Sequence, residues 1–520
     1  MRKYLRHILP GAAIFLLLAL TAISAWRQNR LHSKRTALQN PDVYDEQAAM
    51  VESMAEKFLD DLDLAAVLDP QGGIYRILCP DDTLEQLFTD YLPSYEPQET
   101  LGRELRSRIQ TKTGKIGELT VIWTIFRDTE EAYMDYLDEL LVEQDSKAEA
   151  DRLDLFVIKS EQLSKYCGTE VPVAMTMDEL GIVDGYLAGQ YSSLRSLSAL
   201  YNGEQRAVTW ELPCLVWLYN RKIAEEVLGT DDPNAVSAAI ADWDTFHETA
   251  ARMREAGYRM YSSFTETYAP HLPSVTRSWI NSENAIVFDD AVVDWIHKTK
   301  DEYDAGSVTG TIRRSDEWKH ELRSADDIFG FFVTPHEIHS LIGEREDLAV
   351  AAGPGSYPSD ASWLCGAVGS DNRLLTADLM KQLTTDTEIM RAIFKGTGEP
   401  VNNRYVMQET YSAEIIETEE QQSADLQSDI SPDRSEEEPI AEESEAQAAF
   451  RKLLGGQNPY RIFHEVSAEC ELPYITVYDR RLGDLLAESY IPYFKGETDE
   501  ASALHAFYQN AQIAYPDLTG

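Results

Sequence analysis

Acidic side chains follow two predicted strands at the points where those strands end. Asp81 and Asp82 come after a predicted strand at Ile74–Cys79, and Glu161 comes after a predicted strand at Leu153–Ile158. Ligands of open α/β sheets bind beyond the carboxyl ends of strands, so these carboxylates are candidates for hydrogen bonds to a small solute. The alternatives are an N-cap of the following helix for the two aspartates and a solvated loop for Glu161.

Tryptophans form the second set of candidates. An aromatic ring can stack on the weakly apolar face of a sugar, while carboxylates and amides bind its hydroxyl rim. Trp210 and Glu211 lie together in a run that is rich in Val, Trp and Leu, and Trp279, Trp318 and Trp363 are further candidate stacking rings. Packing in a core is an equally good interpretation of each ring.

The motifs do not indicate a catalytic centre. His336-Glu337-x-His339 resembles a zinc motif only superficially, because helical HExxH places its histidines four residues apart and here they are three apart. No GxSxG, P-loop or GxGxxG occurs in a strand–helix context. Acidic pairs are abundant, so a glycosidase dyad stays open, but no pair stands out. We expect a protein that is not an enzyme and has no metal and no cofactor.

Charge, length and cysteine content further narrow the class of protein. The 520 residues include 46 Lys and Arg against 90 Asp and Glu, a formal charge of -44, which argues against nucleic acid as a partner. The length suits two lobes with additional segments. The 5 cysteines (Cys79, Cys167, Cys214, Cys365 and Cys470) are scattered and form no CxxC pair, so they do not predict a zinc site.

The N-terminus predicts export. Residues 8–26 carry no charge and follow Arg2, Lys3 and Arg6. As a helix the run is about 28 Å long, close to a bilayer core of about 30 Å. Residues 1–35 are therefore expected to be a signal anchor or a cleaved signal peptide, which places the protein on the extracellular face of the cell membrane or makes it secreted. Residues 36–71 predict an amphipathic helical spacer.

Strands and helices alternate along the next part of the chain. After the helix expected at Thr83–Tyr91 come a strand at Glu118–Phe126, a helix at Thr129–Glu143 and the strand at Leu153–Ile158. This alternation predicts parallel βαβ units and an α/β fold. A further helix is expected at Thr245–Glu255.

Residues 412–446 change in character. Between Glu414 and Glu445 thirteen acidic residues accompany one arginine, and no aromatic residue occurs. Such a segment cannot bury enough apolar surface to fold, so we expect a disordered acidic insertion. A solvated spacer is the simplest role, and capture of cations or docking to a basic partner are alternatives.

Several segments, in this order, resemble the extracellular solute-binding proteins of ABC importers, family 1, in its carbohydrate-binding branch. They are AVTWELPCLVWLYNRKIAEEVLG (207–229), AVAAGPGSYPSDASWLCGAVGSDN (349–372), LLTADLMKQLTTDTEIMRAIFKGTGEPVNN (374–403) and LLGGQNPYRIF (453–463). The resemblance implies a periplasmic-binding-protein type II-like fold with two lobes and hinge-crossing strands. Lobe one would comprise 72–209 and 366–405, and lobe two 210–365 and 447–520. It further implies a small solute, most often a mono- or oligosaccharide, and ABC permease subunits as partners.

The sequence also departs from that family pattern. The first cysteine after the apolar run is Cys79, so the lipid-bearing cysteine is missing and a membrane-spanning helix is the natural substitute. Loops that carry aromatic residues in the family here contain His336 and, further on, Tyr357 and Asp360. His336 and Asp360 suit a polar or cationic ligand, and a membrane-tethered sensor or adaptor with a degenerate cleft is the alternative function.

Overall fold

The computed structural model describes residues 73–98, 108–169, 172–343, 345–410 and 443–519. Residues 71–520 form a compact unit of their own. The expected anchor at 1–35, the expected spacer at 36–71 and most of the acidic insertion at 412–446 lie outside the described residues. Within the described ranges, no helix combines the length and the apolar character that crossing a membrane requires.

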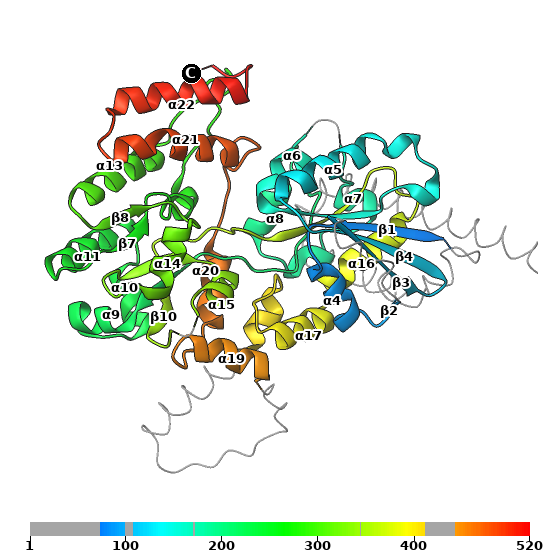
Figure 1. Cartoon of the computed structure of the whole chain (residues 1–520), viewed down its shortest axis with the longest axis horizontal. Coiled ribbons are helices and arrows are strands. Elements are labelled where there is room, and N and C mark those ends of the chain that lie inside the picture. The colour runs from blue at the N-terminus through cyan, green and yellow to red at the C-terminus, as the bar shows by residue number, and fades with distance from the viewer. Residues whose placement is uncertain (1–72, 99–107, 170–171, 344, 411–442, 520) are drawn as a thin grey trace, which may run out of the picture. The chain divides into compact units, whose positions relative to one another are not determined.

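Six strands form the larger sheet, in the order β11-β5-β1-β4-β3-β2 (Figure 1). Their bounds are β1 Ile74–Cys79, β2 Tyr95–Pro97, β3 Ile109–Ile116, β4 Leu119–Phe126, β5 Leu155–Lys159 and β11 Ser362–Gly366. β1 pairs in parallel with both β4 and β5, as the βαβ pattern predicts. β2, β3 and β11 add antiparallel pairs at the two sides, so the sheet is mixed.

The expectation of purely parallel units was wrong at one hairpin. β3 reads IQTKTGKI and pairs antiparallel with β4 through a tight turn at Gly117, whose φ is 57°. Five of the eight residues of β3 are polar and most of the strand is only half-buried, so it lacks the continuous apolar run that marks the central strands. Glycine suits this turn because a positive φ costs it little.

Helices pack on this six-stranded sheet and around it. Their bounds are α4 Thr83–Tyr91, α5 Glu130–Val142, α6 Leu163–Cys167, α7 Met177–Leu180, α8 Ser192–Ser198, α16 Arg373–Thr384 and α17 Thr387–Thr397. The short 3₁₀-helix η4, Ser160–Gln162, follows β5 directly. Tyr133 of α5 donates to the backbone carbonyl of Val157 in β5, which attaches this helix to the sheet.

A second, three-stranded sheet has the order β10-β6-β9 and is antiparallel. Its strands are β6 Val216–Asn220, β9 Gly330–Val333 and β10 Leu348–Ala351, and all their residues are buried. A parallel pair, β7 Tyr261–Ser263 and β8 Val308–Thr311, lies beside it. The run rich in Val, Trp and Leu that contains Trp210 and Glu211 leads into β6.

The remaining helices surround these two smaller sheets. They are α9 Arg221–Leu228, α10 Pro233–Ala239, α11 Trp243–Glu255, α12 Tyr268–His271, α13 Asp290–Asp304, α14 Asp316–Ser324, α15 Pro335–Leu341, α19 Glu445–Leu453, α20 Tyr460–Glu469, α21 Asp479–Phe494 and α22 Glu500–Ala514. α11 begins two residues earlier than expected because Asp242 accepts a hydrogen bond from the Thr245 amide as its N-cap. α21 and α22 pack together against α13 around an apolar core.

Two chain segments run between the six-stranded sheet and the three-stranded sheet. The first leads from Val208, which bridges to Leu364 of β11, into β6. The second leads from β10 back to β11. They meet where Cys214 and Pro358 form a backbone bridge. These paired crossing segments carry Trp210, Glu211, Tyr357 and Asp360 between the two sheets.

All 5 cysteines are buried and none forms a disulfide. Burial raises the pKa of the Cys214 thiol to about 12 and that of Cys470 to about 12. A raised pKa keeps a thiol protonated and unreactive. The burial of all five cysteines makes them packing residues.

Candidate functional site

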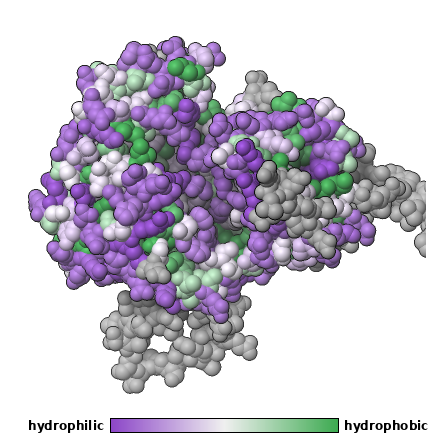
Figure 2. Space-filling view, viewed as in Figure 1, coloured by the Kyte–Doolittle hydropathy of each residue, from purple (hydrophilic) through white to green (hydrophobic). Residues whose placement is uncertain are grey.

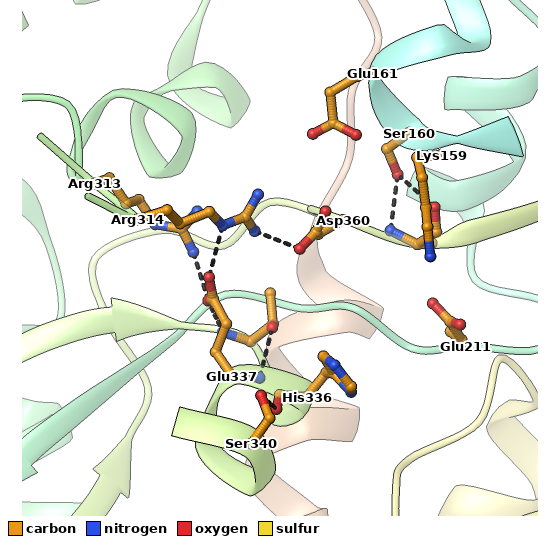
Figure 3. Close-up of polar contacts among 12 residues, drawn as sticks. Lys159, Ser160, Glu161, Glu211, Arg313, Arg314, His336, Glu337, Ser340 and Asp360 are labelled. Atoms are coloured by element: carbon orange, nitrogen blue, oxygen red, sulfur yellow. Dashed lines mark hydrogen bonds and ion pairs between the residues drawn. The ribbon is translucent and has the colours of Figure 1, made fainter. Parts of the chain in front are cut away.

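Polar side chains from both sheets and from the crossing segments converge in one region (Figure 3). Lys159, Ser160 and Glu161 come from the end of β5 and from η4, and Glu211 and Asp360 come from the crossing segments. Arg313 and Arg314 follow β8, and Glu337 lies in the first turn of α15. In the space-filling view the surface is hollowed between the side of α21 and α22 and the side of α5 and α6, and hydrophilic residues surround the hollow (Figure 2).

Glu337 is the buried anchor of this cluster. Its Oε2 lies 2.6 Å from Arg313 Nη2, and its Oε1 lies 2.8 Å from Arg314 Nε. The same carboxylate accepts from the Thr334 amide, and Thr334 Oγ1 accepts from the Glu337 amide, which is a capping box. Burial acts to raise the pKa of Glu337, but the two guanidinium groups hold it below its usual value. A helix cap thereby fixes the position of two arginines.

Arg314 also contacts Asp360, which belongs to the second crossing segment. Arg314 Nη2 lies 2.8 Å from Asp360 Oδ2. Both residues have positive φ, 67° for Arg314 and 72° for Asp360. Arg314 is the third residue of a turn that is closed by the Ser315 amide and the Ile312 carbonyl, a position that favours glycine or asparagine. Two neighbouring side chains are therefore held on a locally strained backbone.

Glu161 pairs with a residue near the C-terminus. Arg480 Nη2, in the first turn of α21, lies 3.1 Å from Glu161 Oε1. Arg480 Nε is also 3.4 Å from Asp484 Oδ2. This ion pair joins the 3₁₀-helix after β5 to a helix that packs beside the smaller sheets.

Side-chain hydrogen bonds of Lys159 and Ser160 attach the end of β5 to the start of β11. Lys159 Nζ donates to Ser362 Oγ at 2.9 Å and lies 3.8 Å from Asp81 Oδ2. Ser160 Oγ accepts from Trp363 Nε1 at 3.0 Å. A serine hydroxyl thus satisfies the indole nitrogen, so the ring of Trp363 is held in the core.

Glu211 sits beneath this region as a buried carboxylate. Its Oε2 accepts from the Ser362 amide at 3.0 Å. Burial raises the pKa of Glu211 to about 7, and the Lys159 ammonium opposes that rise. A group with such a pKa changes its charge near neutral pH.

Two histidines contact one carboxylate at the edge of the cluster. His336 Nδ1 and His339 Nδ1, on α15, lie 3.1 Å and 3.0 Å from Glu399 Oε1, in the segment after α17. Burial acts to raise the pKa of Glu399, but both histidines lower it to about 2. The hydrogen bond to Glu399 raises the pKa of His336. Among the residues described, no group of three metal-ligating side chains is arranged to hold an ion.

The structure brings some of the predicted site residues together and separates others. Glu161, Glu211, His336 and Asp360 lie in the cluster, with Asp81 at its border beside Lys159. Asp82 instead pairs with Arg127. Asp81 Oδ1 accepts from the Thr83 amide, but the N-cap residue of α4 is Asp82, whose side chain makes no cap hydrogen bond.

The candidate aromatic rings are all buried in this structure. Trp318 is 0% exposed and packs against Phe331, and Trp279 lies in the core of the C-terminal helices. Trp210, Trp363 and Tyr357 are 5%, 1% and 8% exposed. These rings lie in apolar runs or core positions, so packing accounts for them. None presents an open face for stacking in the conformation described.

The space beside the cluster is narrow. A pocket of about 20 Å³ lies between Tyr357, Ser160 and Arg480, which is room for about one water molecule. A larger hollow of about 650 Å³ lies elsewhere, at the start of α9. Its Arg221 and Arg345 already donate to backbone carbonyls, so we assign the functional site to the cluster and not to that hollow.

The sequence interpretation missed four central residues, which are Arg313, Arg314, Glu337 as an anchor, and Arg480. A signal for the first two was present, because an arginine doublet directly after a strand is unusual in a chain with 46 basic and 90 acidic residues. For Arg480 no local signal exists, since its partner lies 319 residues away.

Comparison with known proteins identifies the fold. No protein-family model matches the sequence, and no curated protein sequence matches it. Solved structures match over most of the chain. A structure described as an extracellular solute-binding protein family 1 has a TM-score of 0.63 at 13% identity and covers 85% of this chain and 99% of its own.

Two further matches come from named bacteria. The galacto-N-biose-/lacto-N-biose I-binding protein of an ABC transporter from Bifidobacterium longum has a TM-score of 0.54 at 12% identity, covering 86% of this chain and 97% of its own. The sugar-binding protein MalE from Xanthomonas citri has a TM-score of 0.57 at 11% identity, covering 85% and 98%. The resemblance seen in the sequence is thus confirmed at the level of the fold. All three of these neighbours are described as solute-binding or sugar-binding proteins.

Proposed function

We propose that this protein is the extracytoplasmic solute-binding component of an ABC importer. It captures a small solute, a mono- or oligosaccharide, between two lobes that close by hinge motion. Lobe one is built on the six-stranded sheet and lobe two on the three-stranded sheet, with the paired crossing segments as the hinge. The apolar run at residues 8–26 anchors the chain to the membrane, and permease subunits receive the solute.

The observation that carries the proposal is the convergence of hydrogen-bonding side chains from both sheets on one narrow region. Glu161 lies at the carboxyl end of β5, and Arg480 reaches it from the side of the smaller sheets. The side chains of this polar site come from both lobes, on either side of the crossing segments. Such a site suits a ligand that bridges the two lobes. The solute would shift the equilibrium toward the closed conformation only to the extent that it binds this conformation more tightly than the open one.

The binding test is a thermal-unfolding screen of the full chain in detergent, followed by intrinsic tryptophan fluorescence. The panel contains neutral and acidic saccharides, amino acids, polyamines and divalent ions. A ligand at about 100 times its dissociation constant stabilises by about 2.7 kcal/mol, a clear rise in melting temperature. A solute that binds should also reduce the radius of gyration in small-angle scattering. Absence of any stabilising solute would contradict the proposal.

A second candidate is a membrane-tethered sensor or adaptor with the same fold. The buried rings of Trp210, Trp363 and Tyr357 favour it, because they leave no open stacking face. A sensor of this kind would survive a negative solute screen and would instead bind a signalling partner through its lobes.

A further inference from the structure

The arginines of the candidate site have hydrogen-bonding capacity that the protein does not use. Arg313 Nε, Arg314 Nη2 and Arg480 Nε are buried atoms with no hydrogen-bond partner among the described residues. Arg314 Nη2 is within 2.8 Å of Asp360, and Arg480 Nε is within 3.4 Å of Asp484, so both pairs have ion-pair distance without hydrogen-bond alignment. Buried donors are nearly always satisfied in native proteins, so three unpartnered donors that gather at one site are available to a ligand acceptor.

The position of Arg314 is built and is not accidental. Glu337 holds its Nε edge from behind, and the guanidinium of Arg313 is held by the same carboxylate and lies over the ring of Trp318. The turn that presents Arg314 places an arginine at a φ of 67°. Strain of this kind persists only where the surroundings impose it, and it gathers at ligand sites.

Asp360 occupies the place that a ligand would take. Its carboxylate approaches the outer side of Arg314, it sits at a φ of 72°, and its side chain is 34% exposed. Arg480 lies close enough for the charge of Asp360 to act on it. Figure 3 shows Asp360 beside the Arg314 guanidinium, on the side away from Glu337, so the cluster holds the guanidinium groups of Arg314 and Arg480 with Asp360 as a loosely aligned partner.

Resting on the proposed function, we propose that the captured solute carries a carboxylate, and that this carboxylate replaces Asp360 on Arg314. An acidic saccharide such as a uronate combines this group with hydroxyls for Ser160 and Glu161. Guanidinium binds carboxylate through paired N–H donors, a geometry that the unaligned Asp360 does not provide. The absence of an open aromatic face is consistent with a ligand recognised by charge.

The test compares D-galacturonate and D-glucuronate with D-galactose and D-glucose by titration calorimetry on the full chain in detergent. Each acid differs from its neutral partner in the oxidised C6 group. We expect the acids to bind more tightly than the neutral sugars, and we expect their affinity to fall as salt is raised. Succinate is included as a carboxylate without a sugar ring.

Three variants sharpen the comparison. Arg314→Gly keeps a residue that suits the positive φ and should weaken uronate binding about 30-fold. Asp360→Asn removes the competing charge and should tighten uronate binding about tenfold, an effect that mere loss of structure would not produce. Arg391→Gln, which removes a surface arginine that pairs with Glu388 and Glu409, should leave affinity unchanged.

The outcomes separate this inference from the function on which it rests. Neutral sugars that bind as tightly as uronates, with no response to Asp360→Asn, would overturn the inference and leave the importer proposal standing. Binding of succinate alone would support carboxylate recognition and contradict the saccharide. Failure of every carboxylate to bind would overturn the inference. If Arg314→Gly does not fold, Asp360→Asn and the acid–neutral comparison still decide.

Discussion

Glu161 and Arg480 lie 319 positions apart in the chain, yet their side chains form an ion pair at 3.1 Å. Glu161 follows the β5 strand of the six-stranded sheet, and Arg480 opens the helix α21 beside the smaller sheets. The pair is therefore a direct link between the two bodies that the crossing segments connect.

Glu161→Gln tests this link. The two side chains are 27% and 39% exposed, so we expect the free energy of unfolding to fall by less than about 1 kcal/mol. If the two bodies open and close, the variant should shift the radius of gyration upward in small-angle scattering. Lys165→Gln removes the exposed Lys165–Asp138 pair and serves as a control that should leave the radius unchanged. Equal scattering from both variants would contradict a linking role.

The contact between His336 and Glu399 predicts a pH dependence with a definite sign. The hydrogen bond to Glu399 raises the pKa of His336, so its contribution to stability is complete below the ordinary value of 6.5 and is lost as pH rises through the raised value. The pKa of Glu399 is lowered to about 2, so its contribution is complete above 4.5 and is lost as pH falls toward 2. The contact should stabilise most between these limits.

Urea unfolding of the wild type and of His336→Asn at pH 5.5 and pH 8.5 measures this effect. The difference in unfolding free energy between the two proteins should be larger at pH 5.5. Burial opposes the rise in the His336 pKa, and Glu211 and Asp360 add to it, so the test compares differences and not absolute stabilities. A difference that is the same at both pH values would contradict the prediction.

Glu337→Gln should be strongly destabilising. Glutamine can still complete the capping box of α15, but it leaves the half-buried Arg313 and Arg314 without the buried counter-charge that they share. Removal of one partner from a buried ion pair costs about 3 kcal/mol or more. Chemical denaturation measures the loss. The matched control is Glu388→Gln, whose side chain is 85% exposed and which should change stability little.

Gly330→Ala probes the packing of the three-stranded sheet. A Cβ at this position would lie 2.4 Å from the Trp217 ring and 2.7 Å from the Leu218 carbonyl oxygen, and neither group can move freely. Overpacking of this kind costs about 1–3 kcal/mol. Gly185→Ala is the control, because an added Cβ there meets nothing within 4 Å. A Gly330 variant as stable as its control would contradict the packing described.

The local sequence pattern was sufficient to predict the bounds of elements that have a continuous apolar stripe. The bounds expected for β1 and α4 agree with the structure because each has buried residues at strand or helix spacing and a clear flanking turn. β3 was missed because it is half polar and is stabilised by its neighbour β4. For β3, pairing with β4 decides that the segment is a strand, and its own residue types do not.

The site was less predictable than the fold. Glu161 and Asp360 were found because they follow strands or occupy a loop of the resembling family. Their arginine partners were not found, since Arg480 is distant in sequence and Arg314 depends on a strained turn. The tryptophans proposed as ligand contacts are buried in this structure, and that burial depends on tertiary packing that residue type does not reveal.

The five buried thiols make this protein convenient for labelling. Because each free cysteine is enclosed, a maleimide dye should react slowly or not at all with the native chain. One exposed cysteine on each body, for example through Glu143→Cys on the side of α5 and Glu497→Cys after α21, would then carry a donor and an acceptor dye without removal of any native cysteine. Energy transfer between the dyes would report the separation of the two bodies molecule by molecule, with and without a solute.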